Sequence, residues 1–226
     1  MNQVLLFLLP VLAVFMGWGA AYIFKPHVAN GVKLLLAFSG AFLLSVTVLE
    51  FLPEIYGAGI EKVGIFIMLG LLLQIFLEFL SRGAEHGHLH LDKESSQLPW
   101  ALFISLCIHS VFEGFPLSAN QDLLYGIVIH KMPIAVIIST FLLTSNLSRG
   151  KVAVFLAFFA LMTPLGSWLG QMDIFSTQVK TYINAVVVGI LLHVSTTILF
   201  ESSKNHQFNA QKFGIIIFGI VLAYLL

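Results

Sequence analysis

Residues 123–147 read LLYGIVIHKMPIAVIISTFLLTSNL, and this stretch decides the fold. It contains no acidic residue, and its only basic residues are His130 and Lys131. A transmembrane helix needs roughly 20 mostly apolar residues, so the stretch is long enough to cross a bilayer. A membrane strand needs only about 10 residues and alternates apolar with polar side chains, which does not fit. The stretch therefore predicts a membrane-spanning helix with ionisable side chains inside it.

Seven further apolar runs accompany this one. They lie at residues 4–24, 34–49, 63–80, 98–119, 152–169, 182–200 and 213–226. Helices and closed barrels are the only structures that satisfy backbone polar groups in lipid. We therefore predict an all-α integral membrane protein with eight transmembrane helices, forming a single transmembrane domain over residues 1–226 whose first helix is retained. The polar residues 81–97 are expected to form a loop between the third and fourth spans.

The composition excludes other classes of protein. Of the 226 residues, 58% are hydrophobic and 10% are charged, and mean hydropathy is +0.97. Soluble domains average about 25% charged residues, and disordered chains combine low hydrophobicity with high charge, so both are excluded. Basic and acidic residues both number 11, and a chain without net charge is not expected to bind nucleic acid. The single cysteine, Cys107, can form no intramolecular disulfide.

The distribution of basic residues in the connections predicts the orientation of the spans. One group comprises Lys25, Lys33, Arg82, Lys93, Arg149, Lys151, Lys204 and Lys212, and the other comprises Lys62 and Lys180. Cytoplasmic loops carry an excess of Lys and Arg. We therefore expect the larger group, with the loop at residues 81–97, to lie in the cytoplasm and both termini to lie outside.

Three residues of spans four and five are candidate metal ligands. His109 and Glu113 are four residues apart, so on a helix their side chains point the same way. The short connection at residues 118–122 makes the two spans antiparallel neighbours and brings His130 to within about one turn of the same depth. Nitrogen and oxygen ligands suit a borderline divalent cation such as Zn²⁺. His109, Glu113 and His130 therefore predict a metal site with an open coordination position.

Two other ionisable residues lie near the middle of spans, where such residues are costly and mark function by default. Lys131 could pair with Glu113 when no metal is bound. His193 stands alone on span seven and is a candidate pathway residue, although a single membrane histidine is often only a hydrogen-bond partner between helices. Prolines remove a helical hydrogen bond and kink the helix. Kinks are expected at Pro116, Pro133 and Pro164.

Three segments resemble the signatures of a known family. They are His109-Ser-Val-Phe-Glu113-Gly114, Ile129-His130-Lys131-Met132-Pro133 and Met162-Thr-Pro164-Leu-Gly166. With the order of the eight spans, they resemble spans four, five and six of the ZIP (Zrt/Irt-like) family of divalent metal transporters. The resemblance implies movement of Zn²⁺, and in some members Fe²⁺, Mn²⁺ or Cd²⁺, into the cytoplasm through spans four and five. It also implies inverted repeats, with spans 1–3 related to spans 6–8.

The resemblance sets further expectations. The protein is expected to be a transporter and not an enzyme, with the metal as cargo, no organic cofactor and the lipid bilayer as its surroundings. A homodimer is one option for its assembly, and the expected location is the cell membrane, crossed several times. The sequence contains no GxxxxGK[ST] phosphate loop, so alternating access without ATP is expected.

One departure from the family pattern concerns the number of metals. The common fifth-span motif is His-Asn/Asp-x-Pro-Glu-Gly, but here Lys131 and Ile134 occupy the Asn/Asp and Glu positions. A similar His-Lys pair occurs in a branch of the family that has His-Ser-x-x-Glu in span four, which places Ser110 beside the ligands. Our hypothesis is a mononuclear site in which Lys131 replaces the second cation.

Residues outside the site are candidates for the route of the ion. Glu50 and Glu54 end span two on the predicted outer side, where anionic groups concentrate cations. Glu201 lies at the predicted cytoplasmic end of span seven, and Glu78 is interpreted as an interfacial residue of span three. The histidines of the loop are candidates for weak metal binding: His86, His88 and His90.

Two other classes of protein remain as alternatives. A membrane b-type haem protein would use His109, His130 or His193 as axial ligands. An intramembrane metallohydrolase would use Glu113 as a general base, but the sequence contains no HExxH motif.

Overall fold

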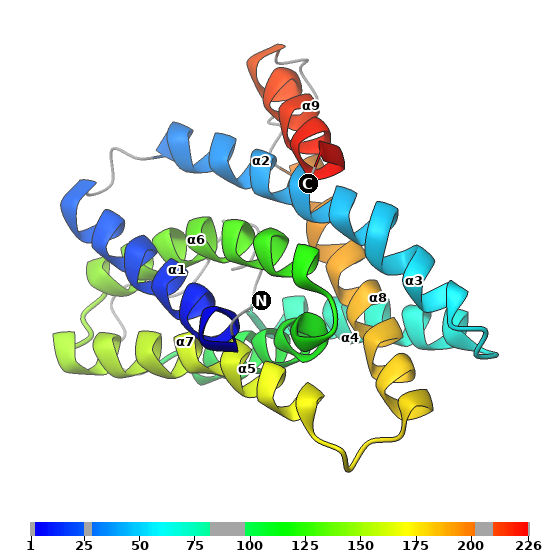
Figure 1. Cartoon of the computed structure of the whole chain (residues 1–226). Helices are drawn as coiled ribbons and strands as arrows, with labels where there is room; N and C mark the ends of the chain where they lie inside the picture. Colours follow the sequence, from blue (N-terminus) through cyan, green and yellow to red (C-terminus); the bar gives the residue numbers. More distant parts are fainter. Residues whose placement is uncertain (1–2, 25–28, 82–97, 202–209, 226) are drawn as a thin grey trace.

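The computed structural model describes residues 3–24, 29–81, 98–201 and 210–225, and within them every regular element is helical (Figure 1). The helices are α1 (Gln3–Phe24), α2 (Ala29–Val46), α3 (Leu52–Gly57), α4 (Val63–Ser81), α5 (Trp100–Gly114), α6 (Gln121–Thr144), α7 (Arg149–Gln171), α8 (Thr177–Glu201) and α9 (Ala210–Leu225). Seven spans are long and apolar enough to cross a membrane, α2 and α3 counting as one, and α9 is a shorter apolar helix. The predicted all-α membrane fold with eight spans is confirmed.

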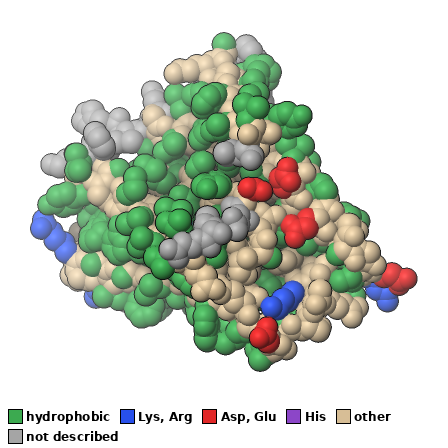
Figure 2. Space-filling model, viewed as in Figure 1, with side chains coloured by type: hydrophobic (Ala, Val, Ile, Leu, Met, Phe, Trp, Pro, Cys, Tyr) green, Lys and Arg blue, Asp and Glu red, His purple; other side chains and the backbone are tan. Residues whose placement is uncertain are grey.

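The outer surface is apolar, as lipid contact requires. On α4 the side chains of Met68, Leu72, Phe76 and Phe79 are all more than half exposed. Figure 2 shows hydrophobic side chains over much of one face, with acidic side chains only on its right-hand side. Soluble monomers rarely expose a large continuous apolar surface of this kind to water. The exposed side chains are therefore the ones that face the acyl chains.

The helices pack in matched pairs. Helix α1 packs along α6, and α7 packs along α5; likewise α4 packs along α8, and α9 packs along α2. Suppose that α1, α2 and α4 (spans 1–3) are exchanged with α7, α8 and α9 (spans 6–8), and α5 with α6. The α1–α6 pair then becomes the α7–α5 pair, and the α4–α8 pair becomes the α9–α2 pair. This is the pattern of contacts that two related repeats produce, with α5 and α6 at the centre.

Glycines allow the closest of these contacts. A Cβ at Gly70 of α4 would overlap the carbonyl oxygen of Val186 in α8, and one at Gly189 of α8 would overlap that of Ile67 in α4. The α5–α7 pair behaves in the same way, since a Cβ at Gly166 of α7 would overlap the carbonyl oxygen of Val111 in α5. Small residues let helix backbones approach in lipid, where van der Waals contact drives association.

The structure corrects two expectations about helix ends and kinks. Helix α5 ends at Gly114, and Pro116 lies in the first turn of the 3₁₀ segment Phe115–Ser118. Pro116 therefore lies beyond the α-helical part of the fourth span and not inside α5, as expected for a residue that lacks the N–H of an α-helical hydrogen bond. Span two does not end before Glu50 but continues through the π-helical turn Thr47–Phe51 into α3. Pro133 and Pro164 do lie inside helices, α6 and α7.

We predict that Gly70→Ala lowers the thermal stability of the detergent-solubilised protein, measured as the melting temperature. The added methyl group meets the backbone of α8, which cannot move aside like a side chain, and such overpacking costs about 2 kcal/mol. Gly19→Ala is the matched control, because a Cβ there meets no atom within 4 Å. Equal melting temperatures for the two variants would contradict the close contact.

Candidate metal site

Three buried side chains converge between α5 and α6. His109 and Glu113 lie one turn apart on α5, and His130 lies on α6. One ligand atom from each residue lies within 4.8 Å of the other two. The exposed fractions of the three side chains are 3%, 1% and 1%. The convergence that the helical spacing predicts is therefore present.

The short turn between α5 and α6 sets the register of the ligands. The 3₁₀ segment Phe115–Ser118 reverses the chain, and the side chain of Asn120 then caps α6 by accepting a hydrogen bond from the backbone N–H of Leu123 at 3.0 Å. An N-terminal cap of this kind fixes where a helix begins. His130 is thereby held at the depth of His109 and Glu113.

The two helices of this hairpin have different main packing partners. The most extensive contacts of α5 are with α7 and α4, whereas those of α6 are with α1 and α2. The sequence predicted only that spans four and five are antiparallel neighbours, and their contacts with other helices are more extensive than those with each other. Both helices are held by their neighbours, and the ligand side chains project into the space between them.

Lys131 supplies the charge that balances Glu113. Its Nζ donates hydrogen bonds to Oε2 of Glu113 and to Oγ of Ser110, both at 3.0 Å. The ammonium also lies 4.7 Å from the ring centroid of Phe159, a favourable cation–π distance. Lys131 is 2% exposed. The pairing of Lys131 with Glu113 expected without metal is present, and the other carboxylate oxygen, Oε1, has no hydrogen-bond partner among the described residues.

A small cavity of about 10 Å³ lies among these side chains. It is lined by His109, Ser110, Glu113, His130, Lys131, Leu106, Ile134 and Phe159. This is about the space that one water molecule needs, so a single ion can enter with little movement. A porphyrin cannot, and the haem alternative is therefore not supported.

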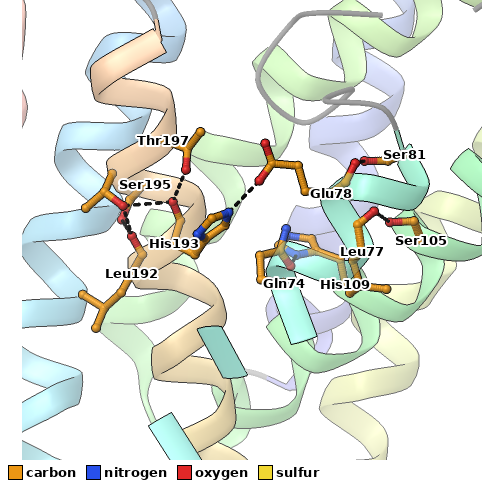
Figure 3. A network of polar contacts seen from close by, with 11 residues as sticks. Gln74, Leu77, Glu78, Ser81, Ser105, His109, Leu192, His193, Ser195 and Thr197 are labelled. Atoms are coloured by element: carbon orange, nitrogen blue, oxygen red, sulfur yellow. Dashed lines mark hydrogen bonds and ion pairs between the residues drawn. The ribbon is translucent and has the colours of Figure 1, made fainter. Parts of the chain in front are cut away.

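A polar network extends from this site along α4 to α8 (Figure 3). The Oε1 atom of Gln74 lies 3.0 Å from Nδ1 of His109, and four residues further along α4 Oε2 of Glu78 lies 2.6 Å from Nε2 of His193. His193 is thus not alone, because Glu78 of α4 is its partner, a contact that the sequence did not predict. One signal was present in the sequence, because Gln74 and Glu78 are the only polar residues of residues 63–80 and share a helix face.

Glu50 and Glu54 are not among the described residues that line the cavity at the ligands. Glu50 is in the π-helical turn and Glu54 in α3, both exposed, and Nδ2 of Asn120 donates a hydrogen bond to Oε2 of Glu54 at 2.8 Å. Glu201 is the last residue of α8, but its side chain lies outside the described residues. The loop histidines also lie outside them: His86, His88 and His90.

Comparisons with known proteins agree with this geometry. The sequence model of the family described as ZIP Zinc transporter matches residues 82–226. Zinc transporter ZIP1 of Danio rerio is 29% identical over 59% of the chain, and Zinc transporter ZIP1 of Plasmodium falciparum is 35% identical over 46% of it. Protein zntD of Dictyostelium discoideum is 27% identical over 57%.

The matched regions cover 46%, 31% and 22% of these three relatives, so the chain spans less than half of each of them. The family match nevertheless includes the whole of α5 to α9 and therefore both helices that carry the candidate ligands. With its multi-pass helical fold and its buried histidine–carboxylate cluster, the chain belongs to the ZIP zinc transporter family.

Proposed function

We propose that this protein moves a divalent metal ion, with Zn²⁺ as the main cargo, into the cytoplasm through the site formed by His109, Glu113 and His130. The observation that carries the proposal is the convergence of three buried ligand atoms within 4.8 Å. Ionisable groups in a membrane interior are costly and are found where function needs them. The names of the relatives, which are zinc transporters in two of three cases, support the choice of ion.

The ligand set suits transient binding of zinc. Zinc bonds to imidazole nitrogen and carboxylate oxygen are about 2 Å long, so two ligands of one ion lie no more than about 4 Å apart. From separations of at most 4.8 Å, side-chain movements of less than about an ångström complete the site. Three protein ligands leave a fourth position open for water or for the next ligand along the route.

Lys131 weakens the binding enough for release. Without metal, the charges of Glu113 and Lys131 cancel in their ion pair. A bound Zn²⁺ takes the carboxylate from the ammonium and leaves two surplus positive charges in a poorly solvating interior, where repulsion between like charges is strong. The ammonium also occupies the side of Glu113 where a second metal would bind. The site is therefore mononuclear, and the ion leaves it readily.

The transport cycle is alternating access without ATP. Because α5 and α6 have different packing partners, relative movement of the two groups of helices changes the ligand separations and hence the affinity. Glu50 and Glu54 serve the outer entrance, and His193, now with Glu78, serves the cytoplasmic side together with Glu201 and the loop histidines. A cell-membrane location, homodimeric assembly and the additional cargoes Fe²⁺, Mn²⁺ and Cd²⁺ are further parts of the proposal and rest on the family resemblance.

We expect His109→Ala and Glu113→Ala to abolish most zinc uptake into proteoliposomes that contain the purified protein. Each change removes a direct ligand, so the loss should exceed the roughly 10–100-fold effect typical of outer-shell changes. The matched control is Glu61→Gln, which changes an exposed carboxylate far along the chain from the ligands. Wild-type uptake by either site variant would overturn the assignment of the site.

The metal content of the purified protein tests the mononuclear site. To remove binding by the loop, His86, His88 and His90 are replaced by alanine. Equilibrium dialysis against a buffer that contains Zn²⁺, followed by elemental analysis of both compartments, is expected to give one bound zinc per chain, and none after the further change Glu113→Ala. Two zinc ions per chain would refute the single-metal proposal, because Lys131 could not then occupy the second position.

The change Lys131→Met should strengthen zinc binding and lower the thermal stability of the metal-free protein. It lowers the surplus charge of the loaded site, and it leaves Glu113 buried without its counter-ion, which is strongly destabilising. Lys212→Met is the matched control, because Lys212 is also buried but donates to the backbone oxygen of Leu199 in α8. Zinc titration calorimetry and melting temperature measure the two effects. Unchanged or weaker zinc binding in Lys131→Met would contradict the role of the ammonium.

A further inference from the structure

Gln74 is the polar side chain that connects α4 to the metal site. It is 0% exposed, and its Oε1 lies 3.0 Å from Nδ1 of His109 on α5. Figure 3 shows Gln74 beside His109, where α4 passes α5. A buried amide is costly to desolvate unless it is hydrogen-bonded. Its placement against one candidate ligand therefore calls for a reason.

The hydrogen bond selects the form of His109 that can bind a metal. A neutral imidazole has one N–H donor and one nitrogen with a free lone pair. An amide oxygen can only accept, so Nδ1 of His109 must carry the hydrogen that it donates to Gln74. Nε2 then keeps the lone pair. One ring nitrogen of His109 lies within 4.8 Å of ligand atoms of His130 and Glu113, and because Nδ1 is taken by Gln74, we infer that Nε2 is the nitrogen offered to the ion. Partners of this kind fix both the tautomer and the ring orientation of metal-binding histidines.

The need to hold α4 against α5 does not explain why a glutamine stands at position 74 beside His109. The same two helices are already joined by a hydrogen bond from Oγ of Ser105 to the backbone oxygen of Leu77, at 2.7 Å. That bond lies one turn along each helix from Gln74 and His109 and uses no candidate ligand. A group that served only to hold the helices together would gain nothing from contact with an imidazole that must stay available to an ion.

The neutral charge of Gln74 also suits the site. The charges of Glu113 and Lys131 cancel, and an amide orients His109 without changing that sum. A carboxylate in the same place would orient the ring equally well but would add a negative charge that holds a dication more tightly. Glutamine thus provides the orientation of His109 without slowing release.

From this geometry we propose that Gln74 is a positioning residue of the metal site: its amide oxygen holds His109 in the Nδ1–H tautomer with Nε2 directed at the ion. The proposal rests on the proposed function, because it specifies how one ligand of that site is prepared. It assigns to span three a direct influence on zinc affinity, although α4 contributes no ligand.

Zinc affinity tests the proposal in the full-length protein whose loop histidines are alanine. Gln74→Met keeps nearly the same volume but removes the acceptor, and we expect the dissociation constant measured by calorimetry to rise about 10–100-fold. Gln74→Glu restores an acceptor and should bind zinc at least as tightly as the wild type. Ser105→Ala removes the neighbouring hydrogen bond between the same helices and should leave the zinc dissociation constant unchanged.

A second readout does not depend on zinc. In protein with ¹⁵N-labelled histidine, the imidazole resonances assigned through His109→Ala should report one Nδ1–H tautomer in the metal-free wild type and a mixture in Gln74→Met. The proposal is overturned if the tautomer is unchanged in Gln74→Met, or if Gln74→Met and Ser105→Ala weaken zinc binding alike. Failure of the wild type to bind zinc would instead refute the proposed function, and the tautomer would still decide the role of Gln74.

Discussion

The ion pair between Glu113 and Lys131 is the interaction on which the site depends. A buried charge without a partner is poorly solvated in the interior of a bilayer. Lys131, at 3.0 Å, gives the Glu113 carboxylate a counter-ion in the absence of metal and holds it where it can act as a ligand. The surrounding contacts serve this pair, since Ser110 accepts a second hydrogen bond from the ammonium and Phe159 covers it.

The fold provides the precision that such a site needs. Glycine contacts bring α4 against α8 and α5 against α7 at backbone distance, and these contacts leave little freedom for the helices to rotate. The ligands therefore approach one another because their helices are held from behind. In lipid, close helix packing holds the fold together, whereas in water the burial of apolar surface in a hydrophobic core drives association.

Much of this arrangement could be predicted from the sequence. The spans follow from the length of the apolar runs, and the meeting of His109, Glu113 and His130 follows from a four-residue spacing and a short turn. The Glu78–His193 pair and the Gln74 contact could not be predicted, because they join helices far apart in the chain and depend on which face of α4 packs against α5 and α8. The end of α5 at Gly114 was missed for a local reason, since an apolar run does not reveal where an α-helix tightens into a 3₁₀ turn.

The short connection between α5 and α6 has a consequence for how the site can open. At that end the two helices are tied together by the few residues from Phe115 to Asn120, whereas their other ends, at Trp100 and Thr144, have no such tether. If α5 and its packing partners tilt away from α6 and its packing partners, the two helices separate least next to the turn at residues 115–120 and most at their far ends. Because His109 and His130 lie between the turn and those free ends, a separation of the ends at Trp100 and Thr144 would open the ligand set by less than it parts the helix ends.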